Sequence, residues 1–328
     1  MVIILAEGNG KEIRPAFELE VDMEIGEEND FECQTSASEW KNDIVDGSLL
    51  YVTNTEFGGI VHEIESRTAS NEIIVRGDTW RGILAKKVIK PSSDTSHKTV
   101  SGELNEILRG LIQEHELSSL FSVPEKSTVS ITNFQFDRYC TLLSGIEKML
   151  LSVNYRLDIK YIKSNTKAYV SLEAVPIVDY SKRKEYSQDG GMDFTVCDYR
   201  RGVNHLICLG KGENESRIVK HLYVQQDGSI GTIRYYKGLD EREEVYDYSS
   251  AEEEELIEKG IERLKERMNS KKLEVKLRET IDTEAQIGDI IGGRDYITGI
   301  QVKKPIVGKI FTIKDGVAKT EYRIEGDD

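Results

Sequence analysis

Apolar and polar residues alternate strictly in the segment 17–25, FELEVDMEI. The apolar side chains take one face, and four acidic residues take the other: Glu18, Glu20, Asp22 and Glu24. A period of two residues is that of a half-buried β-strand. Short apolar runs bounded by turn residues predict further strands at 49–53, 59–66 and 71–76. We therefore expect residues 1–98 to form a small β-barrel-like domain.

The period changes after residue 98. Apolar residues spaced three and four positions apart predict one helix over 104–112 and a second over 139–150. Alternation over 157–161, a turn at Ser164-Asn165 and a return run over 167–175 predict a hairpin after the second helix. Residues 99–190 are expected to form an α+β domain.

The polar, charged segment 180–193 contains SKRKEYSQDGG and is the best candidate for a domain boundary. The strand pattern then resumes, with hairpin turns predicted at Asp227-Gly228 and Asp315-Gly316. One helix over 251–269 interrupts it. Residues 191–328 are thus predicted to be a second β-barrel-like domain with an inserted helix. The predicted fold class is α+β, mainly β, with two small β-barrel-like domains and an α+β unit between them.

Composition indicates a globular protein with room for several cores, because the chain has 328 residues and 38% hydrophobic content. It contains no apolar run of about 18 residues, and residues 1–6 are too short for a secretory signal. We expect synthesis in the cytoplasm and no membrane insertion. The net charge of −15 excludes a general electrostatic attraction for nucleic acid.

Motifs for metals, nucleotides and hydrolysis are weak or missing. The four cysteines are far apart and predict buried free thiols rather than a zinc site: Cys33, Cys140, Cys197 and Cys208. The segment LGKGENES, 209–216, lacks the spacing of a phosphate-binding loop and reads as a turn. His205 and His221 lie within predicted strands, as packed or half-exposed side chains. No cofactor and no catalytic residue is predicted.

The acidic face of segment 17–25 has two interpretations. Acid–base catalysis would need two carboxylates in one pocket with separated pKa values, and a strand face does not by itself provide that. The simpler interpretation is a solvated face. The functional interpretation is an acidic wall along a channel through which another polyanion moves.

The segment GDTWRGILAKKVI, 77–89, predicts a strand that bends at Gly77-Asp78 into a short helix. An anion could bind at the start of this helix, but Asp78 would itself cap the free N–H groups there. We therefore interpret the segment as a structural corner. Trp80 would anchor it in the core, and its basic residues would face solvent or a neighbouring protein: Arg81, Lys86 and Lys87.

Four blocks in order along the chain carry a resemblance to a known family. They are residues 57–91, YRRGVNHLICLGKGE at 199–213, YYKGLDEREEVYDYS at 235–249 and IGDIIGGRDYITGIQVKKPI at 287–306. Together they resemble the tail-hub proteins of phages that infect Gram-positive bacteria. That family is similar in fold to the baseplate hub of T-even contractile phages and to the N-terminal module of tail-associated lysins.

The resemblance implies a non-enzymatic virion tail component made in the host bacterial cytoplasm. Three copies would form a ring of six barrels that fits a six-fold tail tube to a three-fold spike or fibre. The implied partners are the chain itself, a tail-tube or distal tail protein, a spike, fibre or lysin protein, and a tape-measure protein. DNA would pass through without specific binding. Lysin-type relatives continue into a wall-cutting domain, whereas this sequence ends at Asp328, so that activity is expected from another polypeptide.

Within this family reading, the interface candidates are Trp80, Arg81, Lys86 and Lys87. The candidates for an acidic lumen are Glu18, Glu20, Asp22 and Glu24. Two alternatives stay open. One is a cell-wall hydrolase that uses paired carboxylates, and the other is the same hub in a phage-tail-like bacteriocin.

Overall fold

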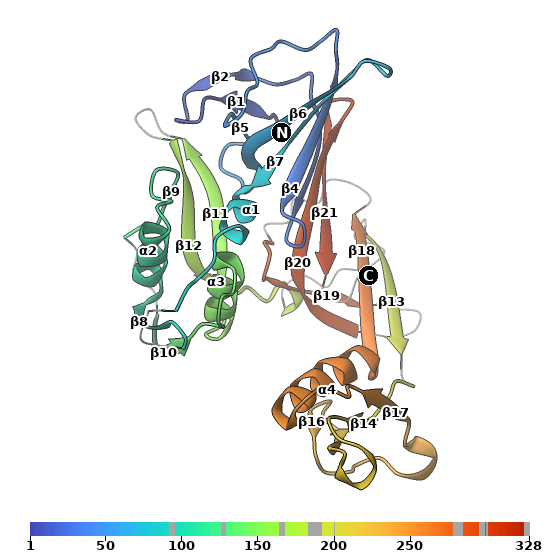
Figure 1. Ribbon diagram of the computed structural model, residues 1–328. Coiled ribbons are helices and arrows are strands. Elements are labelled where there is room, and N and C mark those ends of the chain that lie inside the picture. The colour runs from blue at the N-terminus through green and yellow to red at the C-terminus, as the bar shows by residue number, and fades with distance from the viewer. Residues whose placement is uncertain are drawn as a thin grey trace. The chain divides into compact units, whose positions relative to one another are not determined.

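The computed structural model describes residues 1–91, 96–125, 129–163, 168–182, 192–199, 201–277, 285–294, 299 and 301–324. Within these ranges the chain is mainly β with four α-helices (Figure 1), which confirms the predicted fold class. The chain forms two compact units: residues 1–194 with 274–327 make unit 1, and residues 195–273 make unit 2. Most of the predicted boundary segment, residues 183–191, lies outside the described residues.

A ten-stranded sheet forms the framework of unit 1, in the order β19-β20-β3-β4-β7-β6-β5-β1-β2 with β21 paired to β20. Its strands are β1 (Ile4–Ala6), β2 (Glu12–Pro15), β3 (Glu20–Ile25), β4 (Asp30–Ser36), β5 (Leu49–Tyr51), β6 (Gly58–Arg67), β7 (Glu72–Thr79), β19 (Ile290–Arg294), β20 (Gln301–Lys314) and β21 (Val317–Ile324). The alternation predicted for 17–25 holds in β3, where Val21, Met23 and Ile25 are buried.

The C-terminal strands complete the N-terminal sheet. β20 pairs antiparallel with β3 and sets Phe311 opposite Met23. This grouping differs from the predicted division into 1–98, 99–190 and 191–328, because it joins strands almost 300 residues apart. The hairpin predicted at Asp315-Gly316 is confirmed between β20 and β21, and both of its turn residues have positive φ.

An α+β layer belongs to the same unit. It contains three helices, α1 (Trp80–Ala85), α2 (Leu104–Glu114) and α3 (Leu142–Leu151), and five strands, β8 (Thr99–Glu103), β9 (Phe121–Ser122), β10 (Ser130–Gln135), β11 (Tyr155–Lys163) and β12 (Ala168–Pro176). β11 and β12 form the predicted antiparallel hairpin, while its predicted turn at Ser164-Asn165 lies outside the described residues. The helices α3 and α2 pack beside β11 and β12 (Figure 1).

Aromatic rings join this layer to the first strands. Tyr51 on β5 stacks on Tyr161 of β11 with ring centroids 3.8 Å apart. The ring centroids of Trp80 and Tyr161 are 5.7 Å apart, and all three residues belong to one hydrophobic cluster. All three side chains are fully buried. The sheet and the α+β layer therefore share one hydrophobic core, and the prediction that Trp80 anchors that core is confirmed.

Unit 2 is a four-stranded sheet with one helix. The strand order is β16 (Ile230–Gly231), β15 (Val219–Val224), β14 (His205–Leu209), β17 (Glu243–Asp247). The helix α4 (Glu253–Arg267) is the predicted inserted helix and lies against this sheet (Figure 1). Its Leu256 and Leu264 pack on Leu206, Cys208 and Leu222 of the sheet. The predicted Asp227-Gly228 turn is confirmed between β15 and β16.

Two further strands, β13 (Met192–Tyr199) and β18 (Ser270–Leu277), pair with each other where the chain passes between the units. Three cysteines have described side chains, and they are the predicted free thiols: Cys33, Cys140 and Cys208. In the described part of the chain, no helix is both long enough and apolar enough to span a membrane.

We predict that Gly77→Ala strongly destabilises unit 1. A Cβ at Gly77 would lie 2.1 Å from the carbonyl oxygen of Ile60 and 2.3 Å from the Phe31 ring. Overpacking of this kind costs about 1–3 kcal/mol, and more where backbone must move. Gly110→Ala is the matched control, because no atom lies within 4 Å of its added Cβ and the site is an exposed helix position. It is expected to stabilise by about 0.5–1 kcal/mol. Urea unfolding of both variants measures the difference, and equal effects would contradict the packing argument.

Candidate functional site

The segment 77–89 differs from its prediction in the residue that caps its helix. β7 continues through Gly77 and Asp78 to Thr79, whose Oγ1 accepts a hydrogen bond from the Gly82 amide at 3.3 Å and caps α1. Asp78 does not cap the helix. Its carboxylate instead accepts from Lys86 Nζ at 2.6 and 2.7 Å. The segment is a structural corner, as predicted, but Thr79 rather than Asp78 begins the helix.

Arg81 does not face a neighbouring protein. Its side chain is 2% exposed, Nε donates to Glu56 Oε1 at 2.5 Å, and Nη1 donates to Glu147 Oε1 at 2.7 Å. Nη2 donates to the Leu157 carbonyl oxygen at 3.2 Å. The interface prediction is therefore wrong for Arg81 and for the fully buried Trp80, because one face of α1 points into the core. Lys86 remains on the surface with a side chain that is 64% exposed, and Lys87 is half-buried.

Further charges are buried beside Arg81. Arg156 bridges Asp289 and Asp158, each at 2.8 Å, and Asp289 is fully buried. Lys309 on β20 is 4% exposed and donates to Gln286. Burial lowers the pKa of Lys309 to about 8, against the opposing effect of the Glu56 carboxylate. The corner, the hairpin β11–β12 and the C-terminal strands are thus joined by ionic contacts within unit 1.

Three of the four predicted lumen residues lie along one face of β3. Glu20 and Asp22 are exposed, and Glu24 is half-buried. Burial raises the pKa of Glu24, while the Arg323 guanidinium, 2.8 Å away, opposes this rise. Glu18 precedes the strand and differs from the others, because its side chain is 8% exposed and pairs with Arg14 and Lys41.

The neighbouring strand extends the acidic face. In the register of β3 and β4, Asp22 lies directly opposite Glu32, and Asp30 lies on the same side of β4 as Glu32. Like charges at directly opposed positions destabilise a sheet. Arg76 on β7 offsets part of this repulsion by donating to Glu32 at 2.7 Å. The face remains predominantly negative, with five carboxylates over two strands: Glu20, Asp22, Glu24, Asp30 and Glu32.

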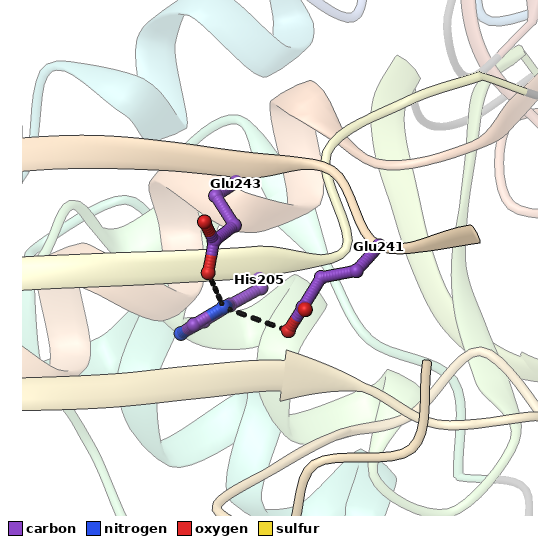
Figure 2. A group of neighbouring side chains, drawn as sticks. All are labelled: His205, Glu241 and Glu243. Carbon is purple, nitrogen blue, oxygen red and sulfur yellow. Dashed lines mark ion pairs between the residues drawn. The ribbon is translucent and has the colours of Figure 1, made fainter. Parts of the chain in front are cut away.

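Unit 2 holds a cluster of one imidazole and two carboxylates (Figure 2). His205 lies on β14, Glu243 lies beside it on β17, and Glu241 comes from the connection that precedes β17. The Nδ1 atom of His205 is 2.7 Å from Glu243 Oε1 and 3.1 Å from Glu241 Oε1. His205 Nε2 is 2.8 Å from His221 Nδ1. The sequence did not predict this cluster, because His205 is 36 or more positions from both glutamates and the residues follow no ligand spacing.

No protein-family model matches the chain, and no curated protein matches its sequence. Solved structures do resemble it. A tail protein from Neisseria meningitidis MC58 has a TM-score of 0.52 and 12% identity, over 99% of this chain and 96% of its own. The 43 kDa tail protein of prophage MuSo2 from Shewanella oneidensis has a TM-score of 0.55 and 12% identity. The match covers 99% of this chain and 98% of the MuSo2 protein.

These comparisons establish the fold. At 12% identity the likeness lies in the path of the backbone, and it extends over almost the whole of both chains. The chain therefore has the fold of phage tail proteins, in agreement with the resemblance found in its sequence. The more specific expectations of a hub and of a Gram-positive host remain predictions.

We predict that Arg81→Met destabilises unit 1 by about 3–5 kcal/mol, because it leaves the Glu56 carboxylate buried without its cation. Glu56 is 6% exposed and has no easy route to water. Lys86→Met is the control, since it breaks an exposed ion pair at the C-terminal end of the same helix and should cost about 1 kcal/mol or less. Chemical denaturation of the two variants tests this. A loss for Arg81→Met no larger than that of the control would contradict the proposed importance of the buried pair.

We predict that Lys309 makes stability rise at alkaline pH. The unfolded chain holds this proton up to about pH 10.4, whereas the folded chain releases it near pH 8. Between these values the unfolded state binds more protons, so the cost of burying a charged lysine falls as pH rises. The difference in unfolding free energy between Lys309→Met and wild type should therefore shift by up to about 3 kcal/mol in favour of wild type from pH 7 to pH 10. An unchanged difference would show that Lys309 stays charged when folded.

Proposed function

We propose that this chain is a structural protein of a phage tail or a phage-tail-like particle, and that it forms the tail-tip or baseplate hub. The observation that carries the proposal is the likeness in fold to tail proteins over almost the whole chain. The four sequence blocks that resemble tail hubs support it independently. The proposed location is the virion tail, after synthesis in the host cytoplasm.

In the proposed assembly, three copies close into a ring that adapts a six-fold tail tube to a three-fold spike or fibre. Its neighbours would be a tail-tube or distal tail protein, a spike, fibre or lysin protein, and a tape-measure protein. A closed three-fold ring needs head-to-tail contacts, in which one face of each copy meets a different face of the next copy. Lys86 and Lys87 are the remaining interface candidates, because Trp80 and Arg81 lie inside the chain.

The acidic face of β3 and β4 would line the channel. Its five carboxylates repel the phosphates of DNA, so a genome passing through would slide without binding. The net charge of −15 adds to that repulsion. No observation favours the cell-wall hydrolase alternative, since these carboxylates lie along one face of two strands and the likeness to tail proteins does not support it.

Electron microscopy of purified particles tests the location. Gold-labelled antibody raised against this chain is expected at the distal end of the tail, where a hub joins the tube to the spike. Label on the capsid, or spread along the whole tube, would contradict the proposal. Particles from a strain that lacks the gene, treated with the same antibody, provide the background.

Light scattering tests the proposed ring and its interface. The purified chain is expected at about three times its mass of 37.2 kDa, either alone or after mixing with tail partners. The double charge reversal Lys86→Glu with Lys87→Glu should weaken this assembly, because it reverses the charge that the two residues would bring to the contact. Lys259→Glu with Lys265→Glu makes the same change in charge on the exposed side of α4 and should have no effect. A stable dimer would contradict the ring, and intact assembly of the first variant would remove the two lysines from the interface.

A further inference from the structure

The cluster in unit 2 offers ligand atoms of the kinds that bind a divalent metal. His205 Nδ1 and one carboxylate oxygen each from Glu241 and Glu243 lie within 4.8 Å of one another (Figure 2). Strand pairing sets the arrangement, because β14 and β17 run parallel with His205 beside Glu243. The face of the sheet that carries them is opposite the one that α4 covers, since Leu206 and Cys208 point toward the helix.

The Nδ1 atom of His205 lacks a hydrogen bond. His205 is 5% exposed, and Nδ1 is fully buried with no hydrogen-bond partner, although carboxylate oxygens lie 2.7 and 3.1 Å away. A buried polar atom without a partner is unfavourable and rare in native proteins. The nitrogen therefore lies at ion-pair distance from two carboxylates, and a buried ring nitrogen facing two anionic oxygens is an arrangement that a cation would also satisfy.

The other ring nitrogen indicates what completes the site. His205 Nε2 lies 2.8 Å from His221 Nδ1, which can accept a hydrogen bond from it. When Nε2 carries the hydrogen, the lone pair of Nδ1 points toward Glu241 and Glu243, and a cation between them would satisfy all three groups. Histidine ligands usually donate their second N–H in this way, which fixes the tautomer and the ring orientation.

Neighbouring side chains hold the ligands in place. The Tyr223 ring lies across from His205 on β15 and stacks on it with centroids 4.3 Å apart. Arg234 Nε donates to Glu241 Oε1 at 2.7 Å and orients that carboxylate. Glu243 has a side chain that is 54% exposed, so it gives an ion access from solvent.

Unit 2 is small enough that a cross-link would add usefully to its stability. It spans only residues 195–273, and among its described side chains the buried part of the core comprises seven residues. Domains of about 70–80 residues seldom obtain enough stability from a single core and are commonly reinforced by metals or disulfides. A metal at this cluster would tie the connection between β16 and β17 to the central strand β14.

We propose that His205, Glu241 and Glu243 bind one divalent ion of the zinc class, with solvent completing the coordination. An imidazole with carboxylates suits Zn²⁺, whereas Ca²⁺ and Mg²⁺ prefer oxygen ligands alone. Ligand atoms about 2.0–2.2 Å from a tetrahedral zinc lie about 3.3–3.6 Å apart, so each carboxylate oxygen needs to move away from Nδ1 by less than about 1 Å. The exposed Glu243 side chain can make that movement. His221 is a positioning residue in this site.

Calorimetric titration of the untagged full-length chain, stripped with EDTA, with zinc chloride tests the proposal. One ion is expected per chain, and calcium or magnesium chloride should give no saturable heat. Glu243→Gln is expected to weaken zinc binding at least about tenfold, and His221→Phe to weaken it by about 10–100-fold. Glu258→Gln removes the same charge from an exposed position on α4 and should leave binding unchanged. Zinc should also raise the melting temperature of wild type and of this control more than that of Glu243→Gln.

Two results would overturn the site. One is the absence of saturable zinc binding by a chain with native circular dichroism. The other is equal affinity in Glu243→Gln and Glu258→Gln. Nitrogen NMR of the His205 ring gives a second readout that does not depend on affinity. The proposal expects zinc to shift Nδ1 while Nε2 keeps its proton. A ring protonated on both nitrogens and unaffected by zinc would instead make the cluster an ion pair.

Discussion

Arg81 and the charges around it constrain how unit 1 packs. Its guanidinium reaches three separate parts of the chain: the turn before β6 through Glu56, the helix α3 through Glu147, and β11 through the Leu157 carbonyl. Removing charges from water is costly, and the attraction between them repays that cost only when every partner is in place. Any packing that separates the corner from the α+β layer leaves a buried charge unpaired. The aromatic stack of Tyr51, Trp80 and Tyr161 fills the adjacent core and supplies the apolar contacts.

The charges on the surface of the same unit have the opposite arrangement. Asp22 and Glu32 lie opposite each other on adjacent strands, and this repulsion works against folding. The buried residues beneath them, such as Val21 and Cys33, outweigh it. An acidic face held against its own repulsion is physically suited to a channel wall beside a polyanion, which is the role proposed for it. In this unit, paired charges fix the interior and like charges define one surface.

Unit 2 has a different arrangement from unit 1: a helix covers one face of its small sheet, and a polar cluster lies on the other face. The α4 face is apolar and includes Gly260, where an added Cβ would lie 2.6 Å from Cys208 Sγ. On the opposite face, His205 is buried among polar groups that its strand neighbours supply. A bound metal would let a small unit be rigid without a large core. All the ligands of the site come from residues 205–243, within unit 2.

The local elements and the class of fold follow from the amino-acid sequence. Alternation predicts β3, spacing of apolar residues by three and four positions predicts α2, α3 and α4, and the two Asp-Gly pairs predict their hairpins, because each pattern depends on side chains only a few positions apart. The pairing of β20 with the N-terminal sheet is known from the folded chain alone, since strand pairing over almost 300 residues leaves no local pattern. The tertiary structure also decides that Arg81 is buried while Lys86 is not. Both read as polar positions on one short helix, and the difference comes from Glu56 and Glu147, whose nearness to Arg81 exists only in the folded chain.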